Sequence, residues 1–509
     1  MIKFFAFLIC TKMFITKIIG RNIVYCLSVF CMASAAKAQS EIVHIRNGYI
    51  EGLKEENSYV FKGVPYAKTP VGEFRFKAPQ PTTNWIDTLD CTKFSPVAPQ
   101  ASHPVDEENF LSLNIYSNDL KSSKACPVMV WIHGGGMTGG TGKDFNGHAF
   151  SDRDSIVAVT FNYRLGAFGF LELNDLGKDY ATSGNNAVLD CITALKWIKN
   201  NIGKFGGDPD KITVMGESAG AKLVAALLAT PLSDGLIHQA VMESGGVQCI
   251  HDSATAFAIR KRLFEALNIT NPKDILSIST EKIIRAQEKV LSGAQGTNYF
   301  GPVIDGIVYK ENPYKYILHH RRKIRILIGT NKSEAKLFMD FDKRLYHPTE
   351  KVLTDWFGAN GSVVYCAFKK AIAGVADTAS VAVPLLTQYM YQMHSYRLAK
   401  AFSEANYPTW VYRFDYGKGK YGAVHGDELK YVWYIPNAVH NKNINDSLAE
   451  EIHSDWVNFI KGKNVDNSWI RYNAAHPEIK VYDNKAGIQR LSSVYDDIVF
   501  PSSVFVLKP

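Results

Sequence analysis

The fold is decided by the stretch Lys211-Ile212-Thr213-Val214-Met215-Gly216-Glu217-Ser218-Ala219-Gly220. Its first half is a β-branched strand, and its second half is a G-x-S-x-G turn that opens a helix of small residues near Ala219. Such a turn is too tight for Cβ atoms on both sides of the serine, and it predicts that Ser218 presents its hydroxyl to a bound molecule. The pentapeptide arises by chance in roughly one chain in five of this length, so its surroundings decide its meaning.

Strands and helices alternate around this turn. Continuous apolar runs, typical of buried parallel strands, occupy residues 127–132 and 155–161. Apolar residues recur at helical spacing between residues 187 and 202. The other predicted elements are antiparallel strands over 41–52 and 59–61, strands over 240–242, 324–329 and 409–414, and a helical cap over 254–291. This order predicts a single α/β domain over residues 39–509, with a mostly parallel sheet covered on both faces.

The first 38 residues have the composition of an export signal. Basic residues precede an apolar run over residues 23–32, and small residues follow. Residues 36–38 form an A-x-A cleavage site, which predicts that the mature chain starts at Gln39, next to Ala38.

A membrane anchor is the alternative interpretation of this segment. The apolar run is shorter than the roughly 20 residues that span a bilayer, which favours the cleaved signal. Translation from Met13 in place of Met1 would give a more ordinary signal length. We therefore expect an exported protein, periplasmic or secreted, without a membrane span once the signal is removed.

The overall composition is that of a globular protein, with 46% hydrophobic and 21% charged residues among 509. Five of the 57 Lys and Arg lie in the first 38 residues, which contain no acid, so 52 basic residues remain against 49 acidic ones. This near balance gives no support for a nucleic-acid partner. Neither metal-ligand spacing nor a disulfide framework is found in the later cysteines, Cys91, Cys126, Cys191, Cys249 and Cys366.

A glycine loop follows the strand over residues 127–132. His133 is succeeded by Gly134, Gly135 and Gly136, and consecutive glycines let backbone N–H groups point into a cavity without side chains in the way. We expect Gly135 and Gly136 to form an oxyanion hole, with the N–H of Ala219 as a third donor. Such a site requires no metal or organic cofactor.

A base and an acid are expected after the serine, in the order acid and then histidine. His425 lies in a loop after the strand over 409–414, with Gly426 on its C-terminal side. Glu334 lies just past the strand over 324–329. The rival acids are Asp305, Asp340 and Asp342, and the rival histidines are His347, His394, His440, His453 and His476.

Further motifs follow one another from about residue 45 to the C-terminus. They include Phe61–Ala67, Leu113–Tyr116, Trp131–Gly136, Asn162–Gly166, Phe205–Pro209, Gly216–Gly220, Gly329–Glu334 and Val424–Glu428. In this order they resemble the type-B carboxylesterase family, which includes cholinesterases and bacterial para-nitrobenzyl esterases. The resemblance implies the α/β-hydrolase fold with helical cap insertions, Ser218 as nucleophile, Glu334 as acid and His425 as base.

Two departures from the family pattern concern specificity. Ala98 and Phe110 stand where the family has a disulfide, so the loop between them is expected to lack that bond. The loop has no tryptophan, whereas cholinesterases place a cation–π platform there, and choline esters are therefore not expected as substrates. Gly296 and Asn298 replace bulky aromatics of the cholinesterase acyl pocket, which predicts a roomier acyl side.

The resemblance implies hydrolysis of a small-to-medium carboxylic ester through an acyl-enzyme at Ser218. The same three residues would also serve a carbamate, thioester, lactone or amide hydrolase, because the oxyanion intermediate is shared. A catalytically inactive adhesion protein is the contrasting class within the family. It is disfavoured because Ser218, Glu334, His425 and the glycine loop are all present.

Overall fold

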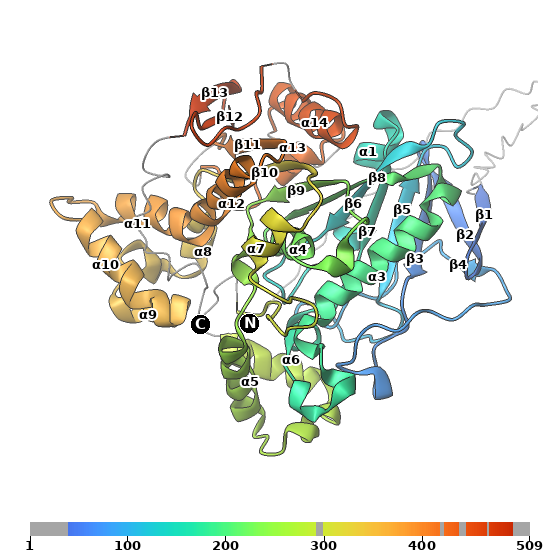
Figure 1. Cartoon of the computed structure of the whole chain (residues 1–509), viewed down its shortest axis with the longest axis horizontal. Coiled ribbons are helices and arrows are strands. Elements are labelled where there is room, and N and C mark those ends of the chain that lie inside the picture. The colour runs from blue at the N-terminus through green and yellow to red at the C-terminus, as the bar shows by residue number, and fades with distance from the viewer. Residues whose placement is uncertain (1–38, 292–298, 418–421, 437–443, 466–467, 492–509) are drawn as a thin grey trace, which may run out of the picture. The chain divides into compact units, whose positions relative to one another are not determined.

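The computed structural model describes residues 39–291, 299–417, 422–436, 444–465 and 468–491 (Figure 1). Residues 39–509 form one compact unit. The predicted signal over residues 1–38, with Met13 and the cleavage site, lies outside the described residues, and so do Gly296 and Asn298.

One sheet runs through the described part of the chain. Its strands are β1 Ser40–Ile45, β2 Gly48–Glu55, β3 Ser58–Pro65, β4 Leu89–Asp90, β5 Ser112–Ser117, β6 Cys126–Ile132, β7 Val157–Phe161, β8 Gly207–Glu217, β9 Gln239–Glu243, β10 Arg325–Asn331, β11 Thr409–Phe414, β12 Glu478–Tyr482 and β13 Gly487–Arg490. They are ordered β1-β2-β3-β5-β7-β6-β8-β9-β10-β11-β12-β13, and β4 pairs with β2. The strands from β7 to β12 in this order pair in parallel, as do β2 and β4. The remaining pairs, which lie toward the two edges of the sheet, are antiparallel. The predicted mostly parallel sheet is confirmed.

The predicted strand over residues 41–52 is wrong in one respect, because a turn at Arg46 and Asn47 divides it into β1 and β2. Strands β4, β5, β12 and β13 were not predicted. Strand β5 is buried along its whole length and lies between β3 and β7, so its place depends on distant partners. Its sequence alone does not show that environment.

Helices cover both faces of the sheet, as expected for this class (Figure 1). They are α1 His148–Asp154, α2 Gly166–Phe170, α3 Asn186–Asn201, α4 Ala219–Leu228, α5 Ser253–Leu267, α6 Thr280–Leu291, α7 Pro313–His319, α8 Ala335–Phe341, α9 Glu350–Phe357, α10 Gly361–Ala371, α11 Thr378–Thr387, α12 Met393–Glu404, α13 Leu429–Val432 and α14 Asp446–Ile460. Within the described residues, none of these helices has both the length and the apolar character needed to cross a membrane.

The two faces of the sheet carry separate hydrophobic clusters, and β6 shows how the chain supplies both. Val128, Val130 and Ile132 enter the cluster that contains α3, α4 and α12, whereas Met129 and Trp131 enter the cluster of α1 and α14. Alternate side chains of a strand point to opposite faces, so a continuous apolar run is required here. Burial of each such side chain contributes about 1.5–3 kcal/mol relative to its exposure.

A third hydrophobic cluster lies among the helices from α8 to α11, beside one edge of the sheet (Figure 1). Leu353, Trp356 and Phe368 are buried in it. This helical region was not predicted. The predicted cap over residues 254–291 forms α5 and α6, and α6 borders the cavity described below.

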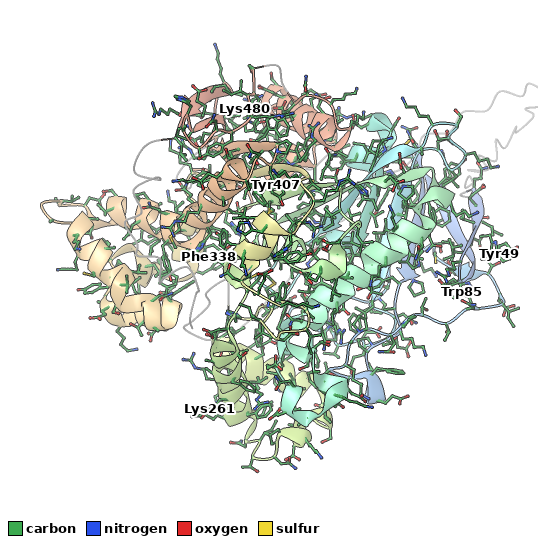
Figure 2. The ribbon with its side chains drawn as sticks, viewed as in Figure 1. Tyr49, Trp85, Lys261, Phe338, Tyr407 and Lys480 are labelled. Atoms are coloured by element: carbon green, nitrogen blue, oxygen red, sulfur yellow. The ribbon has the colours of Figure 1, made fainter. Side chains whose placement is uncertain are left out.

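Side chains fill the space between the sheet and its helices (Figure 2). Tyr407 is buried, and its hydroxyl donates to the carbonyl oxygens of Ile317 and Arg321 at 2.5 and 3.2 Å. Tyr49 and Trp85 lie at the outer edge of the sheet, where the indole Nε1 donates to the Tyr49 carbonyl at 2.8 Å. The expected absence of a disulfide framework agrees with the cysteines of the described region, which are all free.

Candidate active site

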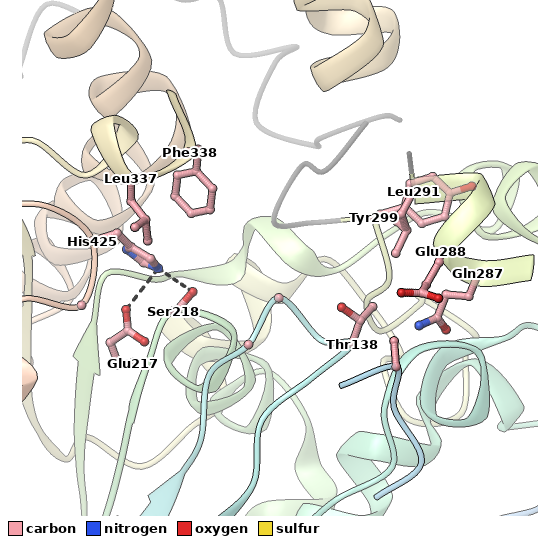
Figure 3. Close-up of a pocket in the computed structure, with 14 residues that line it drawn as sticks. Thr138, Glu217, Ser218, Gln287, Glu288, Leu291, Tyr299, Leu337, Phe338 and His425 are labelled. Carbon is pink, nitrogen blue, oxygen red and sulfur yellow. Dashed lines mark hydrogen bonds and ion pairs between the residues drawn. The ribbon is translucent and has the colours of Figure 1, made fainter. Parts of the chain in front are cut away.

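Ser218 stands at the sharp turn between β8 and α4. Its backbone has φ 56° and ψ −118°, a strained conformation for a residue with a side chain. A Cβ at Gly216 would lie 2.6 Å from the Gly220 carbonyl carbon, and a Cβ at Gly220 would overlap the Ile132 carbonyl oxygen. The expected steric reason for the two glycines is therefore confirmed. The Ser218 side chain faces a cavity (Figure 3).

The structure brings together the three residues predicted around this turn. His425 Nε2 lies 2.8 Å from Ser218 Oγ, and His425 Nδ1 lies 2.6 Å from Glu334 Oε2. A carboxylate can only accept, so Nδ1 carries the proton that faces Glu334, and Nε2 can accept the serine hydroxyl. The geometry is that of a nucleophile, a base and an acid that orients the base.

Glu334 is fixed by neighbours from two strand ends. The Ser244 hydroxyl donates to Glu334 Oε1 at 2.5 Å, and the Asn331 N–H donates to the same oxygen at 2.7 Å. The Ser333 N–H also donates to the Ala423 carbonyl at 2.9 Å. This bond connects the turn that carries Glu334 to the loop that carries His425. Sequence analysis did not place Ser244 in the site. Its position directly after the parallel strand β9, next to Ser218, is the signal that could have found it.

The rival acids are engaged elsewhere. Asp305 accepts backbone N–H groups of residues 307–309, Asp340 accepts the Tyr346 hydroxyl, and Asp342 pairs with Arg344. Each of them therefore has a structural partner in the described chain.

Within the described residues, none of the rival histidines hydrogen-bonds to the Ser218 hydroxyl, which faces His425. His347 contacts Thr378, His453 contacts Asp154, and His476 lies in a turn. His394 is buried, and burial lowers its pKa to about 3, so it is neutral at physiological pH. His440 lies outside the described residues.

The glycine loop lies against the serine. A Cβ at Gly134 would be 3.3 Å from the Ser218 Cβ. Gly135 and Gly136 have φ of 104° and 63° and line the cavity with Ser218. Within the described residues, the backbone N–H groups of Gly135, Gly136 and Ala219 have no hydrogen-bond acceptor in the protein. Ala219 begins α4, where the helix dipole adds to its N–H as an anion donor.

The cavity beside Ser218 has a volume of 610 Å³. Helix α8 and the loop of the histidine supply one wall, and α6 with Tyr299 supplies the other (Figure 3). Leu337 and Phe338 make the first wall apolar, whereas the second wall combines Leu291 and Tyr299 with the polar side chains of Gln287 and Glu288. The volume lies within the range of small-molecule sites.

Comparison with known proteins identifies the family. The model of the carboxylesterase family matches residues 39–491. Para-nitrobenzyl esterase of Bacillus subtilis (strain 168) is 33% identical over 473 residues, which cover 86% of this chain and 94% of that protein. The chain belongs to the carboxylesterase family.

Other relatives agree. Fumonisin B1 esterase of Sphingopyxis macrogoltabida is 31% identical, with 87% of this chain and 86% of that protein covered. The crystal structure of Geobacillus stearothermophilus carboxylesterase EST55 at pH 6.2 superposes with a TM-score of 0.80 at 33% identity, covering 90% of this chain and all of that one. The predicted α/β-hydrolase fold and the class of enzyme, a carboxylic ester hydrolase, are confirmed at the level of the family.

This carboxylesterase also places a second carboxyl group beside the base. Glu217 Oε1 lies 3.1 Å from His425 Nε2, the same nitrogen that faces Ser218 (Figure 3). Burial raises the pKa of Glu217 to about 7. Burial lowers the pKa of His425, but the carboxylates of Glu217 and Glu334 outweigh it and the pKa ends above 6.5. A proton held between Glu217 and Nε2 would therefore have to leave before His425 could act as a base toward Ser218.

Further buried acids lie beneath the turn. Glu428 accepts a hydrogen bond from the Asn331 amide, and Glu243 accepts one from Trp456 Nε1 at 2.6 Å. Burial raises the pKa of Glu243 from 4.5 to about 8, although the Trp456 bond opposes this shift. Glu243 therefore keeps its proton in the folded carboxylesterase at neutral pH.

We predict that Glu243→Gln makes the folding stability of the protein less sensitive to rising pH. The unfolded chain releases this proton near pH 4.5 and the folded chain near pH 8, so folding stability falls through that window as the pH rises. The slope is about 1.4 kcal/mol per pH unit for one such group. Gln cannot ionise and still accepts a hydrogen bond from Trp456. Between pH 5 and 7.5, the free energy of unfolding in urea should therefore fall less steeply in Glu243→Gln than in the wild type, by about 1 kcal/mol per pH unit. Equal slopes of the unfolding free energy against pH in the wild type and in Glu243→Gln would contradict this prediction. Glu265→Gln, at an exposed side chain of α5, is the control.

Proposed function

We propose that this chain is a serine carboxylesterase that cleaves small-to-medium carboxylic esters, with Ser218 as nucleophile, His425 as base and Glu334 as the acid that orients it. The observation that carries the proposal is the hydrogen-bonded series Glu334, His425 and Ser218, which opens onto a largely apolar cavity. The names of the para-nitrobenzyl and fumonisin B1 esterases, both over 30% identical, support the same activity.

Acylation begins when Ser218 Oγ attacks the ester carbonyl carbon. Its proton passes to His425 Nε2 across the 2.8 Å hydrogen bond. The carbonyl oxygen becomes an oxyanion that accepts from the N–H groups of Gly135, Gly136 and Ala219. Each donor of this kind contributes about 3 kcal/mol to the transition state. Glu334 stabilises the imidazolium through Nδ1–H.

Collapse of the tetrahedral intermediate breaks the bond to the alcohol oxygen. The departing alkoxide takes the proton from His425 Nε2, and the acyl group remains on Ser218 Oγ. A water molecule then attacks the acyl carbon while His425 accepts its proton. The second collapse releases the carboxylic acid and returns the proton to Ser218.

The cavity supports neutral esters of moderate size as substrates. Its two walls present Leu291, Tyr299, Leu337 and Phe338 to a bound ester, and the polar side chains among them include the carboxylate of Glu288. No lysine or arginine lines it among the described residues, so an anionic ester would find no counter-charge there.

We predict that Ser218→Ala lowers kcat for short-chain aryl esters by at least about 10⁴-fold, because the covalent route is lost while oxyanion binding remains. Steady-state hydrolysis of a chromogenic ester measures this change. Ser277→Ala, at an exposed serine on the protein surface, is the matched control and should keep full activity. A folded Ser218→Ala protein with undiminished turnover would refute the assignment of the nucleophile.

We further propose that the protein is exported and cleaved after Ala38. The basic and apolar composition of residues 1–38 supports this, as does the family match, which starts at residue 39.

The expected result is that the full-length chain, expressed in a bacterium with a signal peptidase, yields a mature protein with Gln39 at its N-terminus outside the cytoplasm. N-terminal sequencing of the purified protein measures this. A protein that retains Met1 or Met13 and stays in the cytoplasm would contradict export.

A further inference from the structure

A lysine lies directly behind the reacting serine. Lys222 is one helical turn after Ser218 on α4, and its N–H donates to the Ser218 carbonyl at 3.0 Å. Its side chain is fully buried, with 0% exposure. Burial of an ammonium group is costly unless other groups offset it, so this residue is unexpected in a helix otherwise made of small and apolar residues.

The ammonium group faces an aromatic ring that also contacts the base. Lys222 Nζ lies 5.4 Å from the centroid of Tyr391, and the Tyr391 ring lies 4.4 Å from the His425 ring at a tilt of 32°. Tyr391 belongs to the π-helical turn Gln388–Gln392 that joins α11 to α12. Such turns displace a side chain from regular helical spacing and occur often at functional sites.

Charged and titratable groups from several elements surround this arrangement. Facing Lys222 are Glu217 at the end of β8, Glu334 after β10, Cys249 after β9 and His394 on α12. Facing His425 are Glu217, Glu334, Lys222 and the rings of Phe338 and Tyr391. Among these groups, Lys222 is the cation that faces both the base and the two carboxylates.

We propose that Lys222 is a positioning residue for the esterase reaction, and that its charge, acting across Tyr391, opposes the stabilisation of the His425 imidazolium by the carboxylates of Glu217 and Glu334. This inference rests on the proposed roles of Ser218 and His425. It adds a residue outside the three that carry the reaction.

The size of the effect follows from electrostatics. The two ring contacts place the ammonium within about 10 Å of the imidazole, and at an effective dielectric constant of about 20 a unit charge there shifts a pKa by about one unit. Lys222 lowers the pKa of His425, in opposition to the two carboxylates. Burial lowers the pKa of Lys222 itself to about 8, so the ammonium is mostly charged at pH 7. Loss of that charge therefore favours imidazolium, which cannot act as a base.

The test is the pH dependence of kcat/KM for Lys222→Met and Lys222→Arg. Met has similar length and no charge, so the acidic limb of the plot of kcat/KM against pH should move to higher pH by about one unit. Near the foot of that limb, kcat/KM should fall by up to about tenfold. Lys222→Arg should return the limb to the wild-type position. Lys222→Gln is a second uncharged variant, which should show the same displacement as Met.

Lys430→Met is the matched control. Lys430 lies five residues after His425, but its ammonium is exposed and 3.4 Å from Asp427, so its loss should leave the limb in place. A Lys222→Met or Lys222→Gln enzyme with lower activity but an unmoved limb would overturn the proposal, because a structural role alone gives that result. If instead the wild-type activity does not depend on Ser218, the proposed function fails first, and the two failures are thereby distinguished.

Discussion

The close approach of β6, β8 and α4 at the Ser218 turn is the constraint on which the rest of the structure depends. Gly216 and Gly220 let the two strands and the helix meet within van der Waals distance of the Ile132 carbonyl, and Ser218 is thereby held in a strained backbone conformation. The cost of such strain, about 1–3 kcal/mol, is sustained by the apolar clusters on both faces of the sheet. The strained turn presents the hydroxyl at the carboxyl ends of the parallel strands. The same edge of the sheet carries the glycine loop, the acid and the histidine, so short loops can bring all of them to one point.

The charge balance beneath this point is unusual for a protein interior. Glu217, Glu243 and Glu428 are buried with raised pKa values, and each can hold a proton in the folded state. A base surrounded by carboxylates tends to remain protonated, which would prevent it from accepting the serine proton. The buried ammonium of Lys222 acts in the opposite direction. The pKa of His425 is therefore set by the whole cluster of charges. Each charge can shift that pKa because the fold excludes water from the cluster.

Much of the fold could be predicted from sequence because its central strands are continuous apolar runs. Ser218 and Glu334 closely follow β8 and β10, and His425 lies in the loop after β11. The residues that sequence analysis missed act through contacts with distant parts of the chain. Ser244 reaches Glu334 across 90 residues, and Tyr391 reaches His425 from a π-helical turn whose irregular register is invisible in periodicity. The break between β1 and β2 was missed because apolar residues continue on both sides of the turn, although the buried side chains change from the odd positions Val43 and Ile45 to the even position Ile50 across it. Tertiary contact, which no local pattern encodes, explains why the roles of Ser244 and Tyr391 were missed.

The most direct test of the central claim is covalent labelling of the purified enzyme with a dialkyl fluorophosphate, followed by peptide mass spectrometry. A serine hydroxyl reacts with such a probe only when a base activates it. The account predicts one phosphoryl adduct, on the peptide that contains Ser218, formed in parallel with loss of esterase activity and strongly slowed in His425→Ala. Loss of activity with the adduct on another residue, or equal labelling in the absence of the His425 imidazole, would contradict the account.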